Sequence, residues 1–122
     1  MAMTTAKFRA DGPPITVTIR CGFADPGAYE LFLWEADRNS RQELGAGNFI
    51  NADDDTFSLS SDAGQTGKIL QCVATVNPLD NNGQFGVSMI VAQGGDQLAN
   101  EVVSSTSNLP SVTVALFVQL EG

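Results

Sequence analysis

The fold is decided by a stretch near the N-terminus that reads Ile15-Thr16-Val17-Thr18-Ile19-Arg20-Cys21. Apolar and polar residues alternate in it without a break, which is the period of a β-strand with one face on a core and the other on solvent. Similar runs separated by turn residues predict further strands along the chain. These predicted strands cover residues 28–34, 43–46, 56–60, 69–76, 85–92, 97–104 and 112–120.

Turn residues punctuate these strands. Asp25-Pro26-Gly27 reads as a tight turn, and Asn82-Gly83 and Gly94-Gly95 each favour a hairpin because their residues tolerate positive φ. Residues 97–104 also fit a helical turn through Leu98 and Val102, although a returning strand fits better. Seven or eight strands without an amphipathic helix predict an all-β fold, an antiparallel β-sandwich, with a small barrel as the alternative.

The length of the chain limits the number of domains, and its net charge limits the classes of partner that it can bind. A chain of 122 residues predicts one domain over residues 1–122, of which residues 1–14 are expected to be irregular. Six Lys and Arg against fourteen Asp and Glu give a net charge of −8, which argues against nucleic acid and anionic membranes as partners. We find no apolar run of signal-peptide or membrane-span length, so the sequence predicts a cytoplasmic protein or one secreted without a signal.

The chain contains no histidine, and this removes Ser-His-Asp and Cys-His catalytic sets and imidazole zinc sites. Glu30 and Glu35 are expected on opposite faces of one strand, so they do not form a carboxylate pair. Cys72 has no cationic neighbour closer than Lys68 to activate it as a nucleophile. We therefore predict no catalytic residues and no enzymatic activity.

Two cysteines and one tryptophan are candidate structural residues. Cys21 and Cys72 lie far outside C-x-x-C spacing, and we interpret each as a small buried apolar residue. Trp34 ends a run of bulky residues from Ala28, which predicts a strand covered on both faces with Trp34 in the core.

The order of Cys21, Trp34 and Cys72 resembles an immunoglobulin-like domain. The strand that ends at Cys21 looks like strand B, Trp34 stands where the core tryptophan of strand C would lie, and residues 56–60 fall where strand E would run. The resemblance implies a sandwich and, as an alternative to two free thiols, a bridge between Cys21 and Cys72. It departs at Leu70, which replaces the expected tyrosine, and a jelly-roll-like sandwich also fits the strand count.

Three consecutive carboxylates, Asp53-Asp54-Asp55, are the candidate metal ligands. Calcium takes six to eight oxygen ligands, and an Asp-rich loop between strands can supply some of them. A solvated turn is the stronger interpretation, because neighbouring side chains diverge and Asp is an ordinary turn former. Calcium is the one candidate cofactor, and the preferred prediction is that the protein binds no cofactor.

Aromatic residues indicate where a partner would bind. Phe32 and Trp34 share one face of their strand, where aromatics could form a sugar-stacking platform. Phe117 lies on the polar side of the last strand, which suggests a second buried layer or an intersubunit contact. We expect a non-enzymatic binding or assembly module for a protein or carbohydrate partner, acting through loops or a sheet face, with a homo-oligomer as one form. The alternatives are a lectin-like carbohydrate-binding module, with or without calcium, and lastly a small hydrolase.

Overall fold

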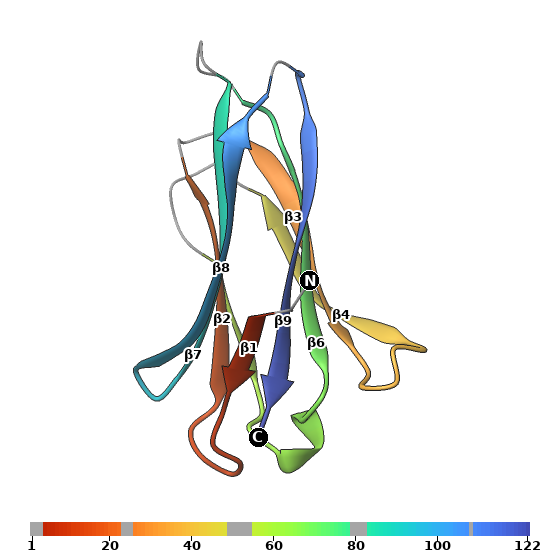
Figure 1. Ribbon diagram of the computed structural model, residues 1–122, viewed down its shortest axis with the longest axis vertical. Helices are drawn as coiled ribbons and strands as arrows, with labels where there is room; N and C mark the ends of the chain where they lie inside the picture. The colour runs from red at the N-terminus through yellow and green to blue at the C-terminus, as the bar shows by residue number, and fades with distance from the viewer. Residues whose placement is uncertain (1–3, 23–25, 49–54, 79–82, 108) are drawn as a thin grey trace.

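The computed structural model describes residues 4–22, 26–48, 55–78, 83–107 and 109–122. Within these residues the chain forms nine β-strands (Figure 1). They are β1 (Thr4–Lys7), β2 (Ile15–Gly22), β3 (Gly27–Trp34), β4 (Arg41–Asn48), β5 (Asp55–Leu59), β6 (Ile69–Val76), β7 (Gln84–Gln93), β8 (Asp96–Thr106) and β9 (Val112–Glu121). A short 3₁₀ turn, Ala63–Gln65, precedes β6. In the described part of the chain we find no helix with the length and apolar character needed to cross a membrane.

The strands form two sheets that pack face to face. One sheet has five strands in the order β1-β9-β6-β3-β4, and the other has four in the order β5-β2-β7-β8. All pairs are antiparallel except β1 with β9, which is parallel. The predicted all-β sandwich is confirmed, and residues 97–104 belong to a strand.

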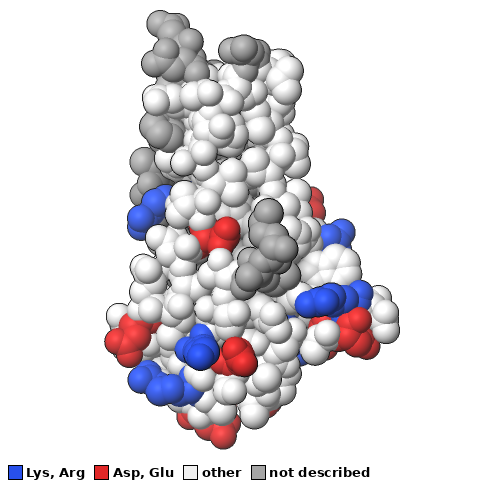
Figure 2. All heavy atoms as spheres, in the orientation of Figure 1, with Lys and Arg blue, Asp and Glu red and all other residues white. Residues whose placement is uncertain are grey.

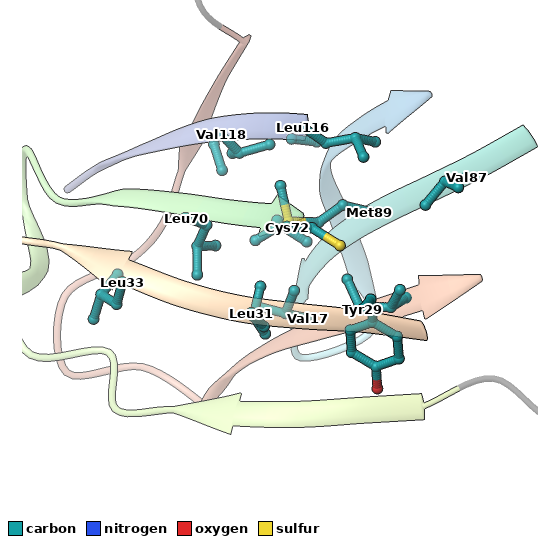
Figure 3. Close-up of a cluster of buried hydrophobic side chains, with 14 of the residues drawn as sticks. Val17, Tyr29, Leu31, Leu33, Leu70, Cys72, Val87, Met89, Leu116 and Val118 are labelled. Carbon is teal, nitrogen blue, oxygen red and sulfur yellow. The ribbon is translucent and has the colours of Figure 1, made fainter. Parts of the chain in front are cut away.

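The core lies between the sheets, where the inward residues of each strand meet. In β2 the inward side chains of Ile15, Val17 and Ile19 are fully buried, as their alternation predicts. In the facing sheet Leu31, Cys72 and Leu116 stand side by side on β3, β6 and β9. Figure 3 shows these residues with Met89 of β7 at the centre of the cluster.

Cys21 and Cys72 do not form the bridge implied by the immunoglobulin resemblance. Cys72 is fully buried in the core, whereas Cys21 is half-buried near the end of β2. Burial raises the pKa of the Cys72 thiol to about 12. Cys72 therefore acts as a small apolar residue, as the sequence predicted.

Residues 1–14 were expected to be irregular, and this expectation is wrong for Thr4–Lys7. These four residues form β1, which pairs in register with the end of β9, Thr4 opposite Val118. Ala6 of β1 and Phe8 after it are buried in the core. Four residues are too few to show a reliable period, and the strand they pair with lies at the other end of the chain.

Of the two hairpins predicted at glycine-containing turns, one forms and the other does not. Gly94 and Gly95 join β7 to β8 in a tight hairpin with φ of 58° and 91°, values that favour glycine. The hairpin predicted at Asn82-Gly83 does not form, because β6 and β7 belong to different sheets. Asn82 lies outside the described residues, and Gly83 has φ of 65° at the start of β7.

A buried glutamine fixes the β1–β2 connection to the body of the sandwich. The side chain of Gln93, at the end of β7, is 1% exposed. Its Oε1 accepts a hydrogen bond from the backbone N–H of Arg9 at 2.8 Å. Its Nε2 donates to the backbone carbonyls of Arg9, at 2.9 Å, and Pro13, at 2.8 Å. One side chain thus adds three hydrogen bonds to the backbone bonds that Asp11 and Gly12 make in this connection.

Candidate functional site

Trp34 lies on the outer face of the five-stranded sheet, which corrects the prediction that it belongs to the core. Because β3 directs Tyr29, Leu31 and Leu33 inward, the alternation of the strand turns Phe32 and Trp34 outward. The bulky residues at every position of β3 reflect a strand with two apolar faces. The outer of these faces is one side of the molecule's surface.

Neighbouring strands extend this apolar surface. Ile69 of β6 stands opposite Trp34, and Phe117 of β9 lies one row further along the strands, opposite Gln71. Ile69 is only 3% exposed, while Phe117 is 38% exposed on the same face. Phe117 is therefore not covered by a second buried layer within this chain, and the intersubunit contact predicted for it stays a prediction.

Arg41 of the edge strand β4 covers part of this surface. Its guanidinium carbon lies 3.8 Å from the centre of the Phe32 ring and 5.3 Å from that of Trp34, both within cation–π range. Gln71 ties the group together, because its Oε1 accepts hydrogen bonds from the Trp34 indole at 2.7 Å and from Arg41 at 3.3 Å. The stacked guanidinium explains why Phe32 is only 8% exposed on an outer face.

A shallow apolar hollow of about 210 Å³ lies on the other side of Trp34. Its walls are Trp34, Ile69 and Phe117, and Arg38 from the β3–β4 turn completes it. Arg38 has φ of 62°, a conformation uncommon for a residue other than glycine, and its backbone N–H bonds to the carbonyl of Glu35 at 2.9 Å. We call Trp34 and the five residues around it the aromatic-arginine cluster: Phe32, Trp34, Arg38, Arg41, Ile69 and Phe117.

The charges of the cluster are cationic. Arg38, Arg41 and the adjacent Lys68 are three of the six Lys and Arg of the chain. Lys68 lies 3.7 Å from the carboxylate of Glu35, but neither arginine forms an ion pair with any described residue. Figure 2 shows charged groups gathered at the projecting β3–β4 hairpin, while the upper part of the visible face is almost uncharged. The cluster thus offers two guanidinium groups that have no carboxylate partner in the described part of the chain.

A second hollow, of about 340 Å³, lies on the same outer face beyond the row of Phe32 and Phe117. Small side chains make room for it, and it is lined by Ala28, Tyr29, Glu30, Ala46, Gly47, Val73 and Thr75. Trp34 lies six positions after Ala28 along β3, a length of about 20 Å. The outer face can therefore accommodate an extended ligand.

Of the three carboxylates predicted as metal ligands, the structure describes Asp55, which binds a tyrosine hydroxyl. Asp55 begins β5, and its Oδ2 accepts a hydrogen bond from the hydroxyl of Tyr29 at 2.6 Å. In Figure 3 the ring of Tyr29 lies in the core with its oxygen directed toward β5. Burial, followed by the Asp55 interaction, raises the pKa of Tyr29. Asp53 and Asp54 lie outside the described residues, and the described ones include no cluster of three metal-binding side chains.

The Tyr29–Asp55 bond depends on Gly47, which passes over it in β4. A Cβ atom at residue 47 would lie 2.6 Å from Asp55 Oδ2 and 2.7 Å from the Tyr29 oxygen. We expect Gly47→Ala to lower the free energy of unfolding by about 2 kcal/mol, because the strand or the bond must shift. Urea unfolding measures the loss. Gly22→Ala, whose Cβ would meet nothing closer than 3.8 Å, is the control, and an equal loss there would contradict the explanation.

Sequence reasoning missed Arg38, Arg41 and Gln71 as members of the site. Arg41 and Gln71 could have been found if the strand pairing were known, because both lie beside the outward residues of β3 in the paired strands. A bulge in the β3–β4 pairing between Leu31 and Phe32 hides that register from the sequence. No family model, no curated protein and no solved structure matches this chain, so the site is defined by its geometry alone.

Proposed function

We propose that this chain is a non-enzymatic binding module that holds its partner on the outer face of the five-stranded sheet. The observation that carries the proposal is the aromatic-arginine cluster, in which an exposed aromatic ring, a hollow and two guanidinium groups without ion partners among the described residues occur together. Sheet strands position these groups except Arg38, which lies in the β3–β4 turn, and Gln71 fixes Trp34 and Arg41 by hydrogen bonds. Such preorganisation limits the conformational entropy lost on binding.

The chemistry of the cluster favours binding over catalysis. Guanidinium groups remain protonated at neutral pH, so they bind anions and orient ligands but do not transfer protons. Aromatic rings with flanking arginines are typical of the residues that dominate binding energies at interfaces. The loop-based alternative with calcium would use Asp53, Asp54 and Asp55, of which Asp55 is engaged by Tyr29.

The proposal is tested by screening the protein on a glycan array and on an array of synthetic peptides, with and without a calcium chelator. We expect a ligand whose affinity falls about tenfold or more in Trp34→Ala and in Phe117→Ala, because each removes a large apolar contact. Val102→Ala is the matched control, since Val102 is 50% exposed on β8 of the opposite sheet. The chelator should have no effect.

Three results would overturn the proposal. In the first, a ligand binds both cluster variants with the same affinity as it binds the unmodified protein. In the second, the chelator abolishes binding. In the third, neither array yields a ligand. Circular dichroism melts of each variant separate lost binding from lost folding.

A further inference from the structure

We infer that the ligand of the outer face is a carbohydrate chain bearing carboxylates, with one acidic sugar ring seated beside Trp34. This inference rests on the proposed function and names its substrate class. It draws on the size of the hollow, the aromatic rings that wall it and the two guanidinium groups at its edge.

The shape of the hollow suits one ring. At about 210 Å³ it is smaller than the roughly 300–1,000 Å³ of sites for drug-sized molecules, and it is open to solvent. Trp34 and Phe117 present aromatic surface to it, against which the C–H face of a sugar ring can pack. Beside it, the amide nitrogen of Gln71 has no hydrogen-bond partner within the described residues and is available to a sugar hydroxyl.

The charge at the edge selects an anion. The planar fork of an arginine matches a carboxylate in bidentate geometry, and both Arg38 and Arg41 lack such a partner among the residues described. The net charge of −8 repels anions at a distance, but screening at physiological salt limits that repulsion to about 8 Å. At contact, the two guanidinium groups therefore dominate. Glu43 on β4 and Glu30 on β3 also face outward and limit how many acidic sugars the face tolerates.

The length of the face favours a chain over a single sugar. The second hollow continues the outer face along β3, and its small residues leave room for further rings. A second copy of the protein fits the site less well, because a two-fold contact through this face would bring the arginines of one copy against those of the other.

The experiment compares two probes that differ only in charge: a (1→4)-linked tetramer of galacturonate and its methyl ester. Isothermal titration calorimetry should show the free acid binding about tenfold or more tighter than the ester, because esterification removes the charge-assisted hydrogen bonds. Arg38→Gln and Arg41→Gln should each weaken binding of the acid by about tenfold. Glu43→Gln should strengthen it, and added salt should weaken it.

Arg9→Gln is the matched control. Arg9 is an exposed arginine that lies 3.5 Å from Asp96, away from the cluster, and its replacement should leave the affinity unchanged. A sulfated tetramer of equal length that binds more tightly than the carboxylate would overturn the choice of carboxylate.

The remaining outcomes separate this inference from the proposed function. If acid and ester bind equally and Trp34→Ala weakens both, the face binds neutral sugars, so the inference fails and the function stands. The same holds if only an acidic peptide binds in a Trp34-dependent way. If light scattering finds a dimer that Phe117→Ala dissociates, a second copy occupies the face and the inference fails. If no probe on either array depends on Trp34, both fail.

Discussion

Replacement of Gln93 by leucine should lower the free energy of unfolding by about 3 kcal/mol or more. The substitution retains most of the side-chain volume but removes three hydrogen bonds to the β1–β2 connection. The N–H of Arg9 and the carbonyl of Pro13 then lose their partner, at roughly 1–3 kcal/mol for each group that stays buried, while the carbonyl of Arg9 keeps only the backbone bond from Gly12 at 3.2 Å. Against a typical total of about 5–15 kcal/mol, this is a large fraction of the stability.

Urea unfolding followed by tryptophan fluorescence measures the effect. Gln97→Leu is the control, because Gln97 is exposed in β8 just beyond the same hairpin. A loss below about 1 kcal/mol for Gln93→Leu, or an equal loss for Gln97→Leu, would show that the connection does not depend on the buried amide.

The protein should also lose about 2–3 kcal/mol of stability between pH 8 and pH 11 because of Cys72. Burial raises the pKa of this thiol from 9.0 to about 12, so the native state keeps its proton where the unfolded state releases it. Above pH 9 the unfolded state binds fewer protons, and the free energy of unfolding falls as the pH rises toward 12. Below pH 9 both states are protonated, and the thiol contributes no pH dependence.

The pH effect of the thiol is isolated by comparing unfolding at pH 8 and pH 11 in the unmodified protein and in Cys72→Ala. The variant should be less stable at pH 8, because it leaves a small cavity in the core. Its further loss at pH 11 should nevertheless be smaller by about 2–3 kcal/mol. Tyr29, whose pKa burial raises above its usual 10.0, contributes with the same sign in both proteins above pH 10. It cancels in the comparison except for the part of its shift that comes from Cys72, which is the smallest of its causes. Parallel losses in the two proteins would remove Cys72 as the cause.

Local patterns sufficed to predict most strands. Alternation in Ile15–Gly22 and in Val112–Glu121 reports the buried face directly, because a period of two has only one interpretation when a single face is apolar. The glycine pair at 94–95 fixes its hairpin for an equally local reason, the positive φ at both residues.

Predictions failed where the answer depended on pairing. Nothing near Trp34 in the sequence says which of two apolar faces of β3 points inward; the partner strands decide it. The Asn82-Gly83 prediction failed similarly, because the same turn residues suit a hairpin and a crossing between sheets. Gln93 looks like any polar strand residue until the β1–β2 connection is folded over it. The strand pattern therefore predicted the aromatic residues of the candidate site, whereas its arginines were identified only from the structure.

The pairing of β1 with β9 determines when folding can finish. Thr4 and Val118 are 114 positions apart in the sequence yet adjacent in the sheet. During synthesis from the N-terminus, β1 must remain without this partner until β9 has emerged. Contacts of such long range slow folding, because the entropy of closing the loop is lost before the contact is gained. The strand β9 thus completes, late in synthesis relative to β1, the layer that carries Phe117 and the candidate binding face.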